Sequence, residues 1–273
     1  MTARKTAKGS RPTRDAGDGV APHPVLSEYY GSAAQRQAWV DDLFDRTADH
    51  YDWITDVMSF GSGRWYRRWA LRRYGLGLGM RLLDVGSGTG VLAQAAQEHV
   101  GDDGTVLALD PSQGMLQQAT QGGVRSPVNG HAETLPVGDD AFDMLTMGYA
   151  LRHVSDLADA FREFQRVLAP GGQVLLLEIT PPRGRLGYTA LRFYLRRLVP
   201  LIARLGRRSR DAQLLMRYYW DTIEGCVPPE QILAALEAAG FEQVQRHVIF
   251  GIFSEYTGVK PDADGASVNK VGQ

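Results

Sequence analysis

The residues of this chain best suited to chemistry gather around a glycine-rich turn. The turn consists of Gly86, Ser87, Gly88, Thr89 and Gly90. It follows an apolar run, 81–85, that contains Asp84, and Asp110 closes the next apolar run, 105–109. Glycines let a backbone turn tightly and come close to a ligand, and a carboxylate at the end of the second strand can accept both hydroxyls of a ribose. The pattern predicts a nucleotide-binding cradle.

The spacing of the glycines indicates which nucleotide the cradle binds. It is Gly-x-Gly-x-Gly, whereas Gly-x-Gly-x-x-Gly is the spacing that seats a dinucleotide pyrophosphate on a helix N-terminus. With Asp84 just before the turn, the arrangement favours S-adenosyl-L-methionine (SAM) as the cofactor. A nicotinamide-dependent oxidoreductase is a poor alternative.

The elements that must hold these residues alternate between strands and helices. We expect strands over 81–85, 105–110, 125–130, 142–147 and 173–179, helices over 89–99, 112–120, 156–168 and 228–239, and a terminal hairpin over 242–259. This alternation predicts a Rossmann-like α/β fold, with a mostly parallel sheet of seven strands and helices on both faces. Ligands of such sheets bind beyond the carboxyl ends of the strands. Asp84 and its turn, Asp110, segment 131–133 and Gly148 lie at such ends, so we expect them to meet at one crevice.

The rest of the chain divides into a lid, an insertion and two tails. We expect a disordered tail over 1–26, an aromatic-rich helical lid over 27–78, a main domain over 79–260 with a basic helical insertion over 183–220, and a second tail over 261–273. Segment 183–210 holds nine arginines and no acidic residue, with apolar residues at helical spacing. Two interpretations stay open: a solvated insertion packed on the sheet, or a flap over an apolar substrate that rests on an anionic membrane surface.

Composition narrows the function classes. A net charge of −1 gives no general reason to expect nucleic acid binding. Cys226 is the only cysteine, which excludes an intrachain disulfide and favours a cytoplasmic location. No apolar run reaches eighteen residues, so peripheral contact is the only membrane association we expect. The six histidines show no ligand spacing, and we expect no metal site.

Further motifs carry a resemblance to a known family. They are Phe44-Asp45-Arg46-x-Ala48-x-x-Tyr51-Asp52, Met58-Ser59-Phe60-Gly61, Leu82-Leu83-Asp84-Val85 with the glycine turn, Ala132-Glu133-x-Leu135-Pro136, Leu151-Arg152-x-Val154 and Arg166-Val167-Leu168-x-Pro170-Gly171-Gly172. Together they resemble class I SAM-dependent methyltransferases, and within these the ubiquinone/menaquinone biosynthesis methyltransferases. The resemblance covers residues 43–260.

The resemblance implies cofactor-side roles. The glycines of the turn approach the methionine moiety, with Asp84 beside its amino group, and Asp110 binds the ribose. Ala132 offers its backbone to the adenine edge, and Tyr51 closes over the cofactor. The full expected set is Tyr51, Asp84, Gly86, Ser87, Gly88, Thr89, Gly90, Asp110, Pro111, Gln113, Met115, His131, Ala132, Glu133 and Gly148. Plainer alternatives stay open: a helix N-cap for Asp110, a core position for Met115 and simple packing for Tyr51.

The acceptor side departs from the family pattern. His131 stands where the family usually has Asp or Asn, and His153 where Asn is common. Thr55 replaces the usual Asn of the lid motif, and Gly63 stands where His is common. Cofactor-side positions therefore match the family better than substrate-side positions do.

A histidine is the expected base of the reaction. A phenol or hydroquinone acceptor must give up its hydroxyl proton, and histidine is suited to accept it near neutral pH. His153 is the leading candidate, with a capping or structural role as its alternative, and His50 is a weaker candidate. The resemblance implies that Tyr149 faces the acceptor. We expect methyl transfer to carbon or oxygen of a small apolar aromatic or quinol-like acceptor. Two alternative functions stay open: a methyltransferase of a specialised pathway, and a non-catalytic protein that binds the cofactor and acts through a partner. The chain could also form a homodimer.

Overall fold

The computed structural model describes residues 19–59, 61–201 and 210–262, without the side chains of 50, 54 and 57–59. Most of the two expected tails therefore lies outside the described residues, as do 202–209 of the insertion. Val20 and Pro22, which we assigned to the first tail, are hydrogen-bonded to the fold. Leu157 N donates to Val20 O at 2.9 Å and Val227 N donates to Pro22 O at 2.8 Å.

A seven-stranded sheet forms the centre of the molecule, in the order β3-β2-β1-β4-β5-β7-β6. The strands are β1 (Arg81–Val85), β2 (Thr105–Asp110), β3 (Pro127–Asn129), β4 (Phe142–Gly148), β5 (Leu168–Ile179), β6 (Glu242–Ile249) and β7 (Phe253–Val259). The first five run parallel, whereas β7 is antiparallel to both β5 and β6. The predicted Rossmann-like, mostly parallel sheet is confirmed.

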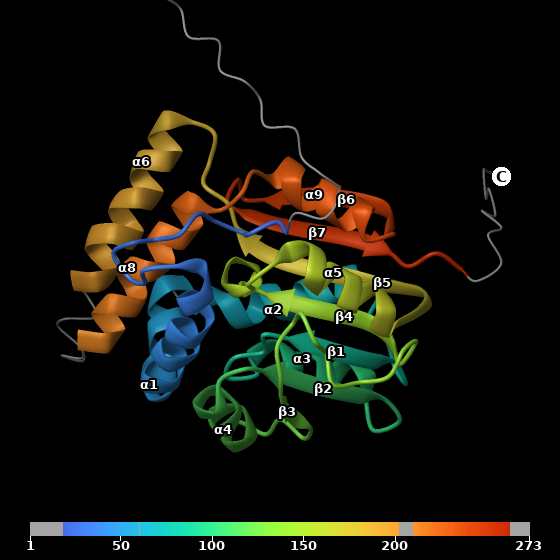
Figure 1. The fold of residues 1–273 in the computed structure, drawn as a ribbon. Helices are drawn as coiled ribbons and strands as arrows, with labels where there is room; N and C mark the ends of the chain where they lie inside the picture. Colours follow the sequence, from blue (N-terminus) through green and yellow to red (C-terminus); the bar gives the residue numbers. More distant parts are fainter. Residues whose placement is uncertain (1–18, 60, 202–209, 263–273) are drawn as a thin grey trace, which may run out of the picture.

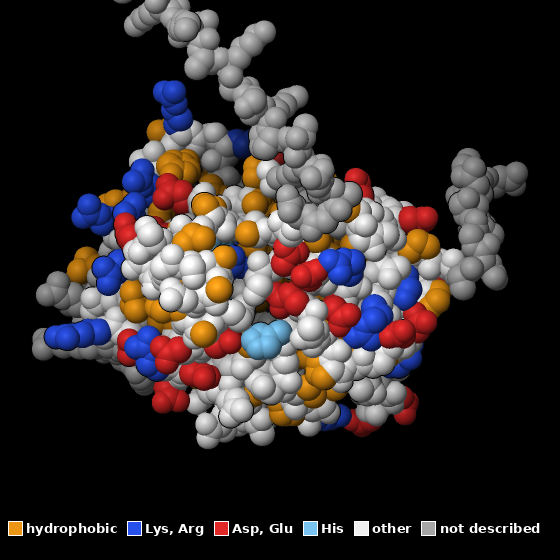
Figure 2. Space-filling model, in the orientation of Figure 1, with side chains coloured by type: hydrophobic (Ala, Val, Ile, Leu, Met, Phe, Trp, Pro, Cys, Tyr) orange, Lys and Arg blue, Asp and Glu red, His pale blue; other side chains and the backbone are white. Residues whose placement is uncertain are grey.

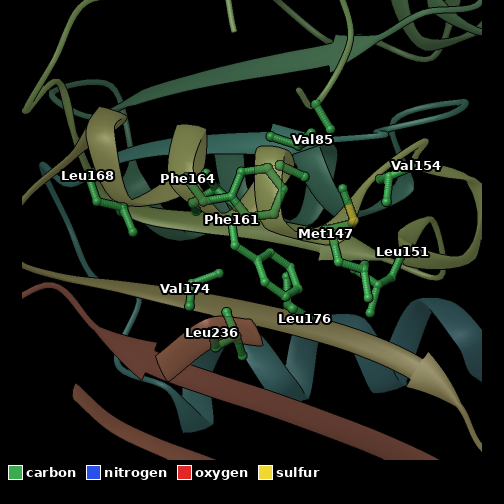
Figure 3. Packing of buried hydrophobic residues seen from close by; sticks show 14 of the residues in the cluster. Val85, Met147, Leu151, Val154, Phe161, Phe164, Leu168, Val174, Leu176 and Leu236 are labelled. Atoms are coloured by element: carbon green, nitrogen blue, oxygen red, sulfur yellow. The ribbon is translucent and has the colours of Figure 1, made fainter. Parts of the chain in front are cut away.

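Helices cover both faces of this sheet, as expected. They are α3 (Val91–Val100), α4 (Gln113–Gln121), α5 (Leu157–Val167) and α9 (Pro229–Ala238). On one face, Phe161 and Phe164 of α5 pack with Leu236 of α9 against Val174 and Leu176 of β5 (Figure 3). Alternate residues of the same strands, such as Leu175 on β5, face α3 on the other side.

The lid and the insertion pack on each other at one end of the sheet. The lid contains α1 (Ala33–Ser59) and α2 (Ser62–Arg73), and the insertion contains α6 (Arg185–Phe193), the π-helix η2 (Tyr194–Leu198) and α8 (Arg210–Gly225). Val40 and Leu43 of α1 share a buried cluster with Leu215 and Trp220 of α8. The carboxyl ends of β4 and β5 point toward these helices (Figure 1). None of the described helices is long and apolar enough to cross a membrane.

One glycine of the predicted cradle, Gly90, allows two parts of the fold to pack closely. Gly90 precedes α3 with a φ of 80°, in the left-handed region. A Cβ atom there would lie 2.4 Å from Val124 Cγ2, so any side chain would push away the segment that follows α4. Close approach between two parts of the fold therefore requires glycine at this position.

Candidate active site

A cavity that is partly open to solvent lies beyond the carboxyl ends of β1, β2 and β4. Twelve of the residues that the sequence predicted line it: Tyr51, Gly86, Gly88, Asp110, Pro111, Met115, His131, Ala132, Glu133, Gly148, Tyr149 and His153. The four loops that we expected to converge therefore meet at one cavity.

Asp84 lies buried at the end of β1, directly behind this lining. Its Oδ1 accepts a hydrogen bond from Thr146 Oγ1 at 2.8 Å, but its Oδ2 has no protein partner. Burial raises the pKa of Asp84 to about 7. A buried carboxylate oxygen without a donor needs one, and the ammonium group of SAM is such a donor, so this part of the site fits the cofactor.

Asp110 at the end of β2 holds the cradle together. Its Oδ2 accepts from Gly88 N at 2.8 Å and its Oδ1 from Ser112 N at 2.9 Å. Burial raises the pKa of Asp110 to about 6, against the effect of these hydrogen bonds. The N-cap of α4 is Ser112, whose Oγ accepts from Met115 N at 3.0 Å. Asp110 is thus not the N-cap of the helix, and each of its oxygens keeps a lone pair for a ribose hydroxyl.

The lid lies directly over Gly88 of the cradle. Gly88 has a φ of 55°, and the atom nearest to a Cβ built there is Tyr51 Cε1 at 3.9 Å. The hydroxyls of Tyr51 and Tyr219, on α1 and α8, are hydrogen-bonded to each other. Burial raises the pKa of Tyr51, so its hydroxyl stays protonated. Tyr51 thus closes the cavity over Gly88 and also joins the lid to the insertion.

Tyr149 follows β4 in a conformation rare for residues other than glycine. Its φ is 63°, and its backbone is held by Tyr149 N donating to Leu177 O at 2.7 Å. The guanidinium of Arg67, from α2, lies 4.8 Å from the ring centroid. Burial raises the pKa of Tyr149 to about 12. The ring is therefore an uncharged wall of the cavity.

His153 is enclosed by aromatic side chains. Its ring stacks on Tyr218 with centroids 5.4 Å apart and meets the edge of Phe44 at 5.1 Å. Its Nδ1 lies 3.4 Å from Tyr218 Oη, and its Nε2 has no protein partner. Burial first, and then the Arg152 guanidinium, hold the pKa of His153 well below its usual range. The imidazole is therefore neutral at physiological pH and able to accept a hydrogen bond.

The site is a nucleotide cradle that opens onto an aromatic chamber, formed by Phe44, Tyr149 and His153. Comparison with known families supports a nucleotide-binding enzyme. The model of the ubiE/COQ5 methyltransferase family matches residues 32–260. The chain belongs to the ubiE/COQ5 methyltransferase family. It is accordingly a SAM-dependent methyltransferase.

Relatives of similar length carry this match. The ubiquinone/menaquinone biosynthesis C-methyltransferase UbiE of Idiomarina loihiensis is 32% identical over 235 residues, which cover 83% of this chain and 92% of the relative. UbiE of Stutzerimonas stutzeri is 33% identical over 237 residues, 84% of this chain and 91% of that one.

Solved structures share the fold. Phosphoethanolamine N-methyltransferase 2 of Haemonchus contortus, in complex with S-adenosyl-L-methionine, has a TM-score of 0.57 at 19% identity, over 85% of this chain and 61% of that one. A SAM-dependent methyltransferase of Aquifex aeolicus has a TM-score of 0.52 at 19% identity, over 71% and 89% of the two chains.

Some of the predicted residues lie outside the lining of the cavity in this ubiE/COQ5 family member. They are Asp84, Ser87, Thr89, Gly90 and Gln113. Asp84 and Ser87 lie buried behind the lining, each with an unpaired oxygen. Gln113 is exposed on α4. His50 is part of α1, but its side chain lies outside the described residues.

Two carboxylates of the lid motif hold α1 on the cradle, a role that the residue patterns alone did not reveal. Asp45 Oδ1 accepts from Gly114 N at 3.0 Å and from Ser112 Oγ at 2.5 Å, at the start of α4. Asp52 accepts a hydrogen bond from the Thr89 hydroxyl in the glycine turn. Both acids belong to the motif that carried the family resemblance, and that motif is the sequence signal from which their role could have been predicted. They fasten α1 onto the cradle.

Proposed function

We propose that this methyltransferase transfers the methyl group of SAM to a ring carbon or hydroxyl oxygen of a small aromatic, quinol-like acceptor. The observation that carries the proposal is the aromatic chamber of Phe44, Tyr149 and His153, in the same cavity as Gly88 and Asp110. Flat aromatic walls beside a hydrogen-bond acceptor suit a hydroxylated ring. The names of the UbiE relatives, quinone C-methyltransferases, support a quinol and a ring carbon.

The cofactor would be held by groups that the fold leaves available. Asp84 Oδ2 would accept from its ammonium group, the Asp110 carboxylate from its ribose hydroxyls, and the backbone around Gly86 and Gly88 would contact its methionine part. Bound SAM supplies an electrophilic methyl group. The protein then has to orient the acceptor and exclude water.

His153 would activate the acceptor. Its Nε2 has no protein partner and its imidazole is neutral, so it can accept a hydrogen bond from the acceptor hydroxyl. That bond draws the proton away and moves electron density to the ring oxygen and the ortho carbon. Burial makes the imidazolium costly, so His153 polarises the hydroxyl rather than storing its proton. Tyr149 and Phe44 would hold the ring against the methyl group.

A second part of the proposal concerns the outer face of the insertion. Leu186, Phe193 and Leu201 are 90%, 61% and 52% exposed. Arginines lie between them, and Figure 2 shows basic and hydrophobic side chains interspersed along the edge formed by α6 and α8. Exposed apolar groups among cations suit an anionic lipid surface. We propose that this face contacts the membrane, while the inner face, through Tyr219 of α8, joins the lid above the cavity.

Genetic complementation tests the pathway part of the proposal. The wild-type chain is expressed in a bacterial host that lacks quinone C-methylation, beside the Asp110→Asn variant as an inactive control. Restored methylated quinone supports a quinol acceptor. Expression without restoration would assign the enzyme to a specialised pathway, the alternative that the departures at His131 and His153 favour.

A further inference from the structure

The insertion carries an arginine-lined groove on its outer side. The helix α6, continued by η2, forms one wall of the groove, and α8 forms the other. The groove is open to solvent and is lined by Thr189, Arg192, Phe193, Arg196, Arg197 and Arg217. None of these residues lines the cofactor cavity. Four guanidinium groups therefore border one hollow that the cofactor site does not use.

The helical period explains why these side chains gather on one face. Residues 189, 192, 193 and 196 follow the i, i+3, i+4, i+7 spacing of a single helix face. Leu195 and Val199, on the opposite face, are buried against α8, whereas the arginines of the groove are exposed. The π-helical turn η2 carries two of them, and such turns are rare and often found at functional sites.

The acids described near the groove have other partners. Asp211 of α8 forms an ion pair with Arg46 at 3.0 Å, and Asp221 and Glu224 accept hydrogen bonds from tyrosine hydroxyls. Asp221 and Glu28 line a second hollow together with two of the arginines, but neither acid forms an ion pair with them. The lining of the groove itself contains no acid. The groove therefore has an excess of positive charge.

The sequence of the segments that the structure does not describe adds no negative charge. Segment 202–209, which belongs to the same insertion, has three arginines and no acid. Residues 1–18 contain five lysines and arginines against two aspartates, and 263–273 contain one lysine and one aspartate. The side chains of these segments are thus basic or neutral as a whole, and the anion that suits the groove comes from outside the chain.

An apolar hollow continues the groove. It is lined by Phe193, Arg197, Leu198 and Leu201, so it shares Phe193 and Arg197 with the groove. Its three apolar side chains are exposed, which is unfavourable in water. Guanidinium groups match the oxygens of a phosphate, and the apolar hollow matches a hydrocarbon chain. A phospholipid joins these two groups in one molecule, whereas a nucleic acid would match the groove alone.

We propose that the groove binds one molecule of an anionic phospholipid. The phosphate would lie between η2 and Arg217, and the first carbons of the acyl chains would lie on Phe193 and its apolar neighbours. The inference rests on the membrane part of the proposed function and narrows it from a face to a site with defined walls. Arg217 directly precedes Tyr218 and Tyr219, which contact His153 and Tyr51, so a bound lipid would also stabilise the helix that closes the cavity.

Titration with lipid monomers tests the site in the absence of a membrane surface. Calorimetry measures the binding of dihexanoyl phosphatidylglycerol and dihexanoyl phosphatidylcholine to the full chain, each below its micelle-forming concentration. We expect one phosphatidylglycerol per chain, bound about tenfold more tightly than phosphatidylcholine, because the arginines repel the choline cation. Phosphatidylglycerol should also slow amide hydrogen exchange in both walls, over 192–198 and 214–220.

Two double variants separate the groove from general positive charge. Arg197→Gln with Arg217→Gln removes one guanidinium from each wall and should lower the affinity for phosphatidylglycerol about tenfold. Arg185→Gln with Arg210→Gln removes the same charge from the same insertion outside the groove, and should change the affinity less than about twofold because distant exposed charges are screened. All four arginines are exposed, so both variants should keep the wild-type melting temperature. Equal losses in the two variants would overturn the site.

Competing ligands have outcomes of their own. Phe193→Ser should lower the affinity for phosphatidylglycerol and leave that for inorganic phosphate unchanged, because only the lipid reaches the apolar hollow. Inorganic phosphate that binds as tightly as the lipid would indicate a site for a free anion. A single-stranded oligonucleotide that binds more tightly than the lipid would indicate a nucleic acid surface. Either result, or no binding of phosphatidylglycerol monomers, overturns the proposal.

Failure of the site and failure of the proposed membrane contact are distinguishable. Sedimentation with vesicles of phosphatidylglycerol and phosphatidylcholine, without binding of monomers, removes the site and leaves the membrane contact. Binding of monomers without sedimentation supports the site and removes the membrane contact.

Discussion

At the scale of single residues, Asp84 links the chemistry of the site to pH. Its pKa in the fold is about 7 against an ordinary value of 3.8, because burial disfavours its charged form. The folded chain therefore binds a proton that the unfolded chain does not between those two values. Without cofactor, this group lowers stability as the pH rises through that window.

A ligand ammonium reverses this preference, because it needs the ionised carboxylate. We expect the affinity for SAM to fall about fivefold from pH 7 to pH 6, because a carboxyl with a pKa of about 7 is half ionised at pH 7 and about one-tenth ionised at pH 6. Calorimetry across that range measures it. Asp84→Asn should bind SAM more weakly and with a shallower pH dependence, to which only Asp110, with a pKa of about 6, still contributes. A wild-type affinity that depends on pH no more than that of Asp84→Asn would show that Asp84 does not bind the cofactor.

His153 should affect catalysis and leave cofactor binding alone. We expect His153→Ala to lower kcat about a hundredfold, since a group positioned to draw the hydroxyl proton away in the transition state contributes on that order. The dissociation constant for SAM should stay within about twofold. His153→Asn, which keeps an acceptor oxygen, should retain more activity than His153→Ala, and His247→Ala on β6 is the control. Equal activity of wild type and His153→Ala would return His153 to a structural role.

At the scale of elements, α1 is fastened to the cradle by its acids. Asp45 accepts hydrogen bonds from Gly114 N and Ser112 Oγ at the start of α4, and an exposed acid such as Asp103 makes no such contact. We expect Asp45→Ala to speed amide hydrogen exchange over 112–116 and to weaken SAM binding about fivefold, because two cap interactions are lost. Asp103→Ala is the control. Unchanged exchange over 112–116 would show that α4 holds its start without the lid.

Much of the element pattern could be predicted because hydrophobic period and turn residues are local signals. β1 and β2 occupy the residues that we expected, 81–85 and 105–110. β5 begins at Leu168, earlier than the expected 173, because segment 168–172 joins the sheet through a register shift opposite Phe142. A bulge of this kind depends on the partner strand, which local periodicity does not reveal.

The candidate site was predictable where it depends on backbone turns and not where it depends on tertiary contacts. Gly86, Gly88 and Asp110 were recognisable from their spacing. The stacking of Tyr218 on His153, in contrast, joins segments far apart in the sequence. No local sequence pattern predicts such contacts.

At the scale of the whole molecule, the basic face of the insertion predicts lipid binding. We expect the protein to sediment with vesicles of phosphatidylglycerol and phosphatidylcholine and not with phosphatidylcholine alone. Arg196→Glu combined with Phe193→Ser should reduce binding about tenfold, and so should high salt, because exposed charges are screened. Arg68→Glu is the control. If the double variant bound these vesicles as tightly as the wild type, the lipid contact would lie outside this face of the insertion.

The central claim concerns the whole assembly of lid, cradle and chamber, and methyl transfer tests it most directly. The purified chain is incubated with isotope-labelled SAM and two hydroxylated rings, hydroquinone and 2,5-dihydroxybenzoate, and the products are located by mass spectrometry and NMR. We predict label on a ring carbon or hydroxyl oxygen of at least one acceptor. His153→Ala should transfer label at no more than about a hundredth of the wild-type rate. Tight SAM binding with no label on either ring would contradict the assignment of the chamber to an aromatic acceptor.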